Sequence, residues 1–239
     1  MKINKLSILV PAYNEEKTIS EVLYRLADLQ LPAGMEKEVI IVNDCSKDAT
    51  GKVIEEFVQK NGNGIFKGFN QPVNQGKGAA LHKAIELATG DYIVIQDADL
   101  ELDPNDILLL LAGIEEKKSA VIYGSRFINN THQNTNFLWH IMGNGFLTKL
   151  SNLFTGFRLT DMMTCYKLIP TSIIKAMPLK EKRFGFEPEV TLRLSKIKGL
   201  RIAEVPISYI ARTKTDGKKI NYKDGLRVIF CILKYKFSR

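Results

Sequence analysis

Runs of consecutive apolar residues alternate with segments of helical periodicity along the first half of the chain. Five such runs predict β-strands, the third being the weakest: residues 6–10, 38–42, 65–69, 91–96 and 120–123. Between these runs, apolar positions recur every three or four residues, which predicts helices after Asn14 as a cap, around 53–58, over 79–88 and after Pro104. Continuous apolar strands separated by amphipathic helices are typical of a doubly wound, mainly parallel sheet with helices on both faces.

The pattern changes from about residue 128 onward. A helical stretch over 137–154 is apolar over a wide arc and carries Trp139. Core packing is the commonest explanation for such a stretch, and an amphipathic face on a bilayer is the alternative, since Trp and Phe favour the membrane interface. A last helix near 222–237 combines apolar and basic residues. That combination suits either a membrane surface or a surface helix covering the core.

Positive charge is concentrated at the end of the chain. Residues 180–239 contain 16 Lys and Arg against 6 Asp and Glu, so they carry all of the excess in the net charge of +8. Such a block suits phosphate-rich substrates, anionic lipid or nucleic acid. No nucleic-acid-binding motif accompanies it, so we expect no nucleic-acid partner. We expect a main domain of residues 1–212 and a basic amphipathic C-terminal segment of residues 213–239, packed on that domain or on a membrane surface.

The composition favours a globular protein of the cytoplasm. The 239 residues are 45% hydrophobic, which suffices for a core, and no run approaches the roughly 18 apolar residues of a membrane span. The first residues run straight into a strand pattern, which predicts no signal peptide. Three widely spaced cysteines predict free thiols in a reducing compartment. We expect the protein to be cytoplasmic and peripheral on the cytoplasmic face of a membrane.

An aspartate-rich motif follows the fourth apolar run. Asp97 and Asp99 are separated by one small residue, and Glu101 follows two residues later. Carboxylates at this spacing offer hard oxygen ligands to a divalent cation such as Mg²⁺ or Mn²⁺. At the carboxyl end of a buried strand they also lie where open α/β sheets bind ligands. A solvated acidic turn before a helix is the alternative reading of an isolated motif of this kind.

Polar side chains follow the other predicted strands as well. Tyr13 and Glu15 come after the first, Asp44 after the second and Arg126 after the fifth. Tyr13 is suited to stack on a base, Glu15 and Asp44 to accept from base or ribose, and Arg126 to contact phosphate bidentately. Each alone is equally consistent with a loop residue or a helix cap. Because the strand ends meet at one edge of the sheet, together they predict a ligand site.

A glycine-rich segment, residues 74–80, opens the third predicted helix and contains Lys77. Backbone amides at a helix start can bind an anion. The spacing is not that of a P-loop, and a turn packed closely on the sheet explains the glycines equally well.

The sequence resembles the family 2 glycosyltransferases of GT-A fold. The motifs that carry the resemblance are LVPAYNEE at 9–16, VNDCS at 42–46, NQGKGA at 74–79 and DADLE at 97–101. Further motifs are similar to the polyprenyl-phosphate sugar synthases, the group of the dolichyl-phosphate mannose and glucose synthases and their bacterial undecaprenyl-phosphate counterparts: YGSRF at 123–127, TDMMTCYK at 160–167, EVPI at 204–207, Arg212 and GKKI at 217–220.

The resemblance implies a set of site residues and cofactors. It implies Mg²⁺ or Mn²⁺ held by Asp97, Asp99 and Glu101, and catalytic roles for Asp99, Arg126 and Asp161. It implies a nucleotide-sugar donor bound by Pro11, Ala12, Tyr13, Glu15, Val42, Asp44, Lys77, Asp97, Ala98, Asp99, Arg126, Arg212 and Lys219. Three features depart from the usual pattern and leave the choice of donor open: Asn43, Cys165 and the segment Gly217-Lys218-Lys219.

The implied reaction moves a hexose from a UDP- or GDP-sugar to a polyprenyl phosphate with inversion. An acceptor phosphate is already anionic at neutral pH, since its second pKa is about 6, so no dedicated general base is needed. We expect Asp161 to orient the acceptor loop or sugar hydroxyls. The alternative is a saccharide hydroxyl acceptor in cell-surface glycan synthesis, for which Asp161 is the candidate base. Nucleotidyl transfer and a non-enzymatic lipid-binding role rank lower.

Overall fold

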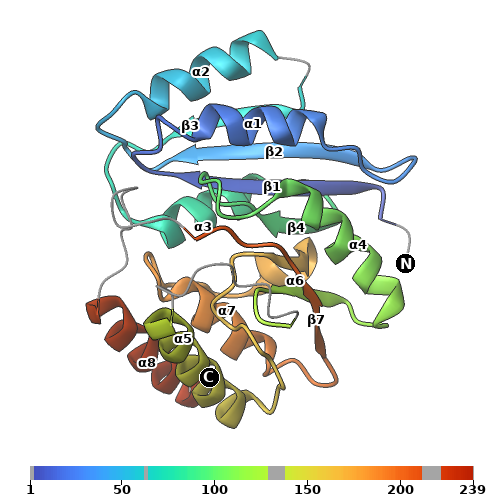
Figure 1. Ribbon diagram of the computed structural model, residues 1–239, viewed down its shortest axis with the longest axis vertical. Coiled ribbons are helices and arrows are strands. Elements are labelled where there is room, and N and C mark those ends of the chain that lie inside the picture. The colour runs from blue at the N-terminus through green and yellow to red at the C-terminus, as the bar shows by residue number, and fades with distance from the viewer. Residues whose placement is uncertain (1–2, 62–63, 129–137, 212–221, 239) are drawn as a thin grey trace.

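Seven strands form one mixed sheet, and helices cover both of its faces (Figure 1). The computed structural model describes residues 3–61, 64–128, 138–211 and 222–238. The strands, in chain order, are β1 (Lys5–Ala12), β2 (Glu36–Asn43), β3 (Phe66–Asn70), β4 (Tyr92–Ile95), β5 (Val121–Ser125), β6 (Lys167–Pro170) and β7 (Ile202–Pro206). Their order across the sheet is β3-β2-β1-β4-β6-β5-β7. β6 runs antiparallel to β4 and β5, whereas the other pairs are parallel.

The helices follow the strands in the expected alternation through the first half. They are α1 (Ile19–Asp28), α2 (Thr50–Lys60), α3 (Lys77–Leu87), the 3₁₀ turn η1 (Pro104–Asp106), α4 (Ile107–Glu116), α5 (Leu138–Thr155), α6 (Thr171–Ala176), α7 (Phe186–Leu194) and α8 (Tyr222–Phe237). Among the described residues, no helix is long and apolar enough to cross a membrane.

Alternating side chains of each strand enter two separate apolar layers, as strand geometry requires. Ile8 and Val10 of β1 pack in the layer formed with α1, α2 and α4. Leu9 packs in the opposite layer, formed with α3, α6, α7 and α8. Both faces of the central strands are therefore buried, which explains why their sequences are continuously apolar.

The five predicted strands are confirmed, but two further strands were missed. β6 and β7 each have only four or five residues and end in proline. β6 begins with Lys167, a charged residue that is fully buried, so its sequence lacks the apolar run that marks β1, β2 and β4. Both strands belong to the second half, where α5 and α8 also pack against each other and against α7 (Figure 1).

Candidate active site

The carboxyl ends of β1, β2 and β4 meet at one edge of the sheet. Leu9 pairs with Ile95 and Ala12 with Asn43, so the loops that follow these strands start side by side. Val42 and Ala12 are buried and pack in opposite apolar layers of the sheet. The Thr18 hydroxyl donates to the Ala98 carbonyl at 2.9 Å, which ties the loop after β1 to the aspartate motif after β4.

Asp44 fixes the glycine-rich turn that opens α3. Its buried carboxylate accepts from the backbone amides of Gln75 at 2.9 Å and Gly76 at 2.7 Å, and from the side chains of Gln71 and Asn74. A carboxylate has about four acceptor positions, so these four contacts use nearly all of the capacity of Asp44. The anion at the start of this helix is therefore supplied by the protein itself. The predicted contact between Asp44 and a nucleoside stays a prediction.

Two residues of the loops after β1 and β2 adopt left-handed backbone conformations. Asn14 has φ of 51° and Cys45 has φ of 55°. The Asn14 amide oxygen accepts from the Lys47 amide at 2.8 Å, so Asn14 connects the two loops. The prediction that Asn14 caps the first helix is wrong, because α1 begins only at Ile19, after a turn. Tyr13 and Glu15, on either side of Asn14 in the sequence, are half-buried.

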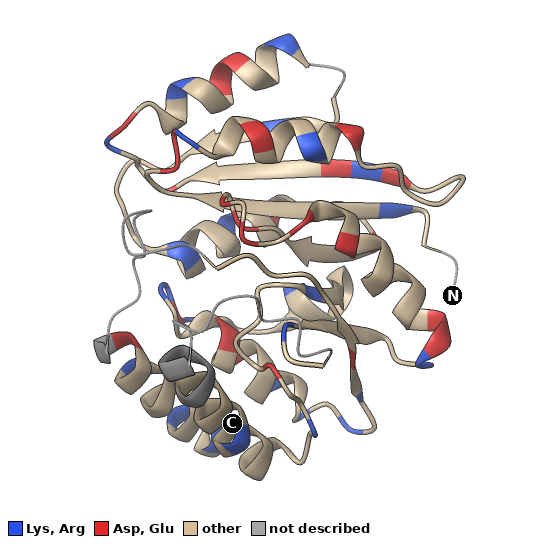
Figure 2. Cartoon of the chain, in the orientation of Figure 1, with Lys and Arg blue, Asp and Glu red and all other residues tan. Residues whose placement is uncertain are grey.

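Asp97 is paired with a lysine. Its Oδ1 atom lies 2.8 Å from Nζ of Lys77, the first residue of α3. Burial alone would raise the pKa of Asp97, but the ammonium of Lys77 holds it below its ordinary value. Oδ1 of Asp99 accepts from the Glu101 amide at 3.1 Å, and the carboxylate of Glu101 accepts from the Tyr209 hydroxyl at 3.1 Å. The loop between β4 and α4 is strongly acidic (Figure 2).

These carboxylates suit a metal site that the substrate helps to complete. The described residues contain no group of three His, Cys, Asp or Glu side chains placed to hold an ion. Asp97, Asp99 and Glu101 therefore do not form a complete protein cage. Oxygen donors from one or two carboxylates match Mg²⁺, which proteins usually bind together with substrate phosphates and water rather than through an all-protein cage. Asp97 and Asp99 fit such a site, provided that a diphosphate completes it.

Arg126 and Asp161 form the best-defined pair at this edge. Nε of Arg126 donates to Oδ2 of Asp161 at 2.6 Å, and Nη2 donates to Oδ1 at 2.8 Å. Asn144 of α5 also donates to Oδ1 at 2.9 Å. Asp161 is fully buried. Although burial opposes ionisation, Arg126 keeps the pKa of Asp161 below its ordinary value. Asp161 is thus a tightly held carboxylate anion.

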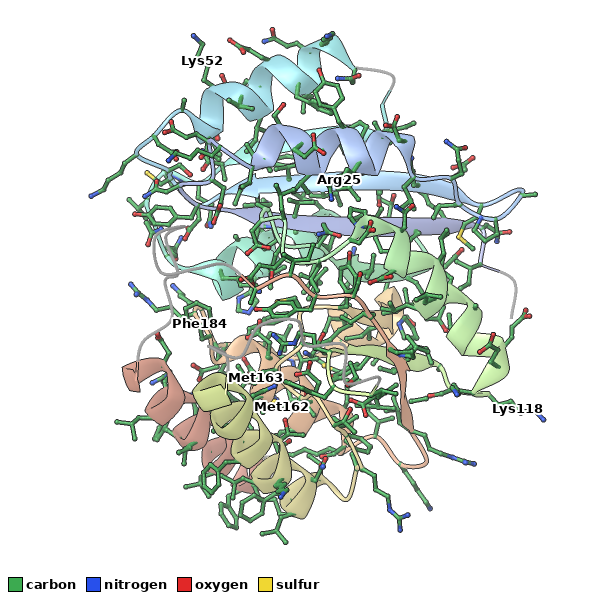
Figure 3. All side chains as sticks on the ribbon, in the orientation of Figure 1. Arg25, Lys52, Lys118, Met162, Met163 and Phe184 are labelled. Carbon is green, nitrogen blue, oxygen red and sulfur yellow. The ribbon has the colours of Figure 1, made fainter. Side chains whose placement is uncertain are left out.

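Glu204 of β7 holds the backbone of the loop that carries Asp161. Its carboxylate accepts from the backbone amides of Thr160 at 2.7 Å and Asp161 at 3.0 Å. Met162 and Met163, labelled in Figure 3, directly follow Asp161 and lie beside α5, where the Met162 amide donates to Thr148. The loop that carries Asp161 is therefore anchored to β7 on one side and to α5 on the other.

Tyr209 joins the acidic loop to the arginine pair. The guanidinium of Arg126 lies 5.1 Å from the centre of the Tyr209 ring, and the Tyr209 hydroxyl donates to Glu101. The aspartate motif and the Arg126–Asp161 pair, predicted from separate segments, thus belong to one site.

Two contacts of Lys77 were not predicted from the sequence. Glu187, at the start of α7, lies 3.4 Å from Nζ of Lys77, and the thiol of Cys165 lies 2.9 Å from the same nitrogen. The sequence signal available for Glu187 was its place near the start of a helix, with a second glutamate, Glu189, two residues later. Arg212 and Lys219, predicted to bind phosphate, lie outside the described residues, as does the side chain of Trp139.

A family model for glycosyl transferase family 2 matches residues 7–177. The chain belongs to this family. An uncharacterised protein of Methanocaldococcus jannaschii is 33% identical over 211 residues, covering 84% of this chain and 86% of the relative. A dolichyl-phosphate beta-glucosyltransferase of Trichomonas vaginalis is 29% identical over 241 residues, covering 96% of this chain and 72% of the relative. The resemblance to the polyprenyl-phosphate sugar synthases is thereby confirmed.

Solved structures of glycosyltransferases share the fold. Glucosyl-3-phosphoglycerate synthase from Mycobacterium tuberculosis, in a complex with Mn²⁺, UDP and phosphoglyceric acid, superimposes with a TM-score of 0.72 at 19% identity, covering 99% of this chain and 80% of that one. TarS of S. aureus, in a complex with UDP-GlcNAc, gives a TM-score of 0.63 at 21% identity, covering 97% and 66%. The expected GT-A fold is confirmed, and the protein is a glycosyltransferase.

Proposed function

We propose that this glycosyltransferase moves a hexose from a UDP- or GDP-sugar to a polyprenyl phosphate, with inversion at the anomeric carbon. The observation that carries the proposal is the state of Asp161. It is fully buried, accepts two hydrogen bonds from the Arg126 side chain and has a lowered pKa. A general base works best when its pKa lies near the operating pH, so Asp161 is a poor base. An acceptor that is already ionised needs no base at this position, and a phosphate monoester is such an acceptor.

The chain's own groups have three tasks in this reaction. Tyr13 and Glu15, in the loop after β1, bind the nucleoside. Arg126, oriented by Asp161, presents positive charge at the site, which helps to position phosphate groups and to stabilise their charge. Asp97 and Asp99 would hold a divalent cation together with the diphosphate, and that cation would stabilise the departing nucleoside diphosphate.

We further propose that the acceptor is reached from a membrane surface. Four large apolar residues of α8 are exposed and recur at helical spacing on one face: Leu226, Phe230, Leu233 and Phe237. Phe146 and Leu153 of the neighbouring α5 are exposed as well. Arg227 and Lys234 lie over the ring of Phe230, and α8 carries several basic residues (Figure 2). Apolar side chains beside cations suit the interface of an anionic membrane.

A donor screen tests the proposal. The purified chain is incubated with Mn²⁺ or Mg²⁺, one nucleotide sugar at a time and a short-chain polyprenyl phosphate, and both nucleoside diphosphate and glycolipid are measured. The matched control acceptor is the corresponding polyprenol, which lacks the phosphate. We expect product from the phosphate and none from the alcohol. Equal transfer to the alcohol, or transfer to an oligosaccharide alone, would refute the proposal.

A further inference from the structure

The ammonium of Lys77 is shared between two carboxylates that come from opposite halves of the chain. It lies 2.8 Å from Oδ1 of Asp97 and 3.4 Å from Oε1 of Glu187. The side chain of Lys77 is 19% exposed and that of Glu187 only 4%. Lys77 begins α3, and Glu187 lies in the first turn of α7. Two buried helix starts thus hold the lysine beside the aspartate motif.

The bonding of Glu187 is incomplete. Its Oε2 atom is buried and accepts no hydrogen bond from any described residue. A buried polar atom without a partner costs free energy, more so when it carries charge. An ammonium has three N–H donors, so Lys77 has the donors to satisfy both oxygens of Glu187. At present its shorter contact is the one to Asp97.

Lys77 and a divalent cation compete for the same carboxylate. Like charges a few ångströms apart repel strongly where the surroundings are partly buried. A cation bound at Oδ1 of Asp97 therefore displaces Lys77 from that atom. The displaced ammonium needs a new anionic partner within reach, and Glu187 provides one.

We propose that Glu187 is a positioning residue that takes over Lys77 when a divalent cation and a nucleoside diphosphate occupy Asp97. This inference rests on the proposed function of the site, since it assumes a metal and a diphosphate there. Before binding, Lys77 neutralises Asp97. After binding, Lys77 pairs with both oxygens of Glu187 and remains beside the diphosphate as an additional cation. Glu187 thereby lowers the cost of freeing Asp97.

The test measures Mn²⁺ binding by the full chain, from the electron paramagnetic resonance signal of free Mn²⁺, with UDP or GDP present. We expect Glu187→Gln to raise the dissociation constant for Mn²⁺ about tenfold, within the range for charged groups in contact. We expect Lys77→Met to lower the dissociation constant measured without nucleotide, because Asp97 is then released. In the Lys77→Met background, Glu187→Gln should change the constant by less than about twofold, because Glu187 acts through Lys77.

The matched control is Glu38→Gln. Glu38 is also a buried carboxylate, 2.9 Å from Lys67 and 3.3 Å from Lys5, but it lies near the amino end of β2, away from the carboxyl ends of the strands. The Glu38→Gln variant should bind Mn²⁺ as the unaltered chain does. An equal effect of Glu187→Gln with and without Lys77, or no effect at all, overturns the inference. If Glu187→Gln does not fold, the test rests on Lys77→Met. Mn²⁺ binding by Lys77→Met that is no tighter than that of the unaltered chain then overturns the inference.

The two proposals fail differently. If the unaltered chain binds no Mn²⁺ with either nucleotide, the metal-assisted donor chemistry of the proposed function fails and the inference fails with it. If the unaltered chain binds Mn²⁺ and the variants bind it equally well, only the role of Glu187 is refuted.

Discussion

Arg126 holds Asp161 through two parallel hydrogen bonds, from Nε to Oδ2 at 2.6 Å and from Nη2 to Oδ1 at 2.8 Å. The pair spans 35 residues of sequence and joins the end of β5 to the loop before β6. Such fork-to-fork contacts fix orientation as well as charge. Asp161 therefore sets the direction in which Arg126 presents its guanidinium to the site.

Asp161→Asn should lower both stability and activity without changing the shape of the pH profile. Leaving Arg126 without its anion should reduce the free energy of unfolding by about 3 kcal/mol, measured by urea denaturation. The acidic limb of kcat/KM should persist near pH 6, because it reports the acceptor phosphate, whose second pKa is about 6. Loss of that limb in the variant would instead identify Asp161 as a general base.

Asp99→Asn should reduce kcat by about 10²- to 10³-fold, the loss typical of removing one charge-stabilising group. Excess EDTA should abolish the activity of the unaltered chain, and Mn²⁺ should restore it. The control is Asp103→Asn, in the same acidic loop, where the side chain accepts from the Asn105 amide and caps η1. Because Asn is also a good cap, this variant should keep its activity. Equal losses in both variants would contradict a metal role for Asp99.

Much of the fold was predictable because β1, β2 and β4 are buried on both faces and so have continuously apolar sequences. β6 escaped prediction because it places Lys167 at a fully buried position. The ammonium there donates to the carbonyls of Met162 and Thr164 and lies 4.5 Å from the centre of the Tyr123 ring. These contacts of the buried ammonium depend on tertiary packing, and no local pattern of apolar residues predicts them.

The residues of the site likewise fall into those that a local sequence pattern predicts and those that tertiary packing places. Asp97 and Arg126 follow predicted strands, so the sequence alone placed them at the edge of the sheet. Glu187 and Tyr209 reach Lys77 and Glu101 from more than 100 residues away. Their positions depend on how β6, β7 and α7 pack onto the first half, which the sequence pattern did not reveal. The acidic motif was therefore predicted without the lysine and tyrosine contacts that define its surroundings.

Acid should weaken the protein partly through Glu38, at the opposite end of β2 from the site. Burial alone would raise the pKa of Glu38, but hydrogen bonds from Ser7, Lys67 and Thr89 lower it from 4.5 to about 2. The folded state thus binds this proton more weakly than the unfolded state does. The carboxylate stabilises the fold above about pH 4.5 and loses that contribution as the pH falls toward 2.

The measurement compares the unaltered chain with Glu38→Gln by urea denaturation at several pH values. The stability advantage of the unaltered chain should shrink by about 1 to 2 kcal/mol between about pH 5 and pH 2, since solvent around the partner lysines screens part of the shift. A constant difference over that range would show that the effect of Glu38 does not depend on its charge.

The exposed apolar face of α8 should decide membrane binding without deciding chemistry. Leu226 and Phe230 are 62% and 52% exposed, one helical turn apart on the same side. Changing both to Glu places negative charge where anionic lipid headgroups would approach, while the buried Val228 and Ile232 still hold the helix on the core. We expect this variant to lose co-sedimentation with anionic vesicles and to lose transfer to a long-chain polyprenyl phosphate in those vesicles. It should retain transfer to a short-chain acceptor in detergent.

The matched control is Tyr24→Glu on α1. Tyr24 is an aromatic side chain that is 43% exposed on the other layer of the molecule, and the variant should bind vesicles normally. Equal vesicle binding by both variants would show that the exposed face of α8 is not the membrane contact.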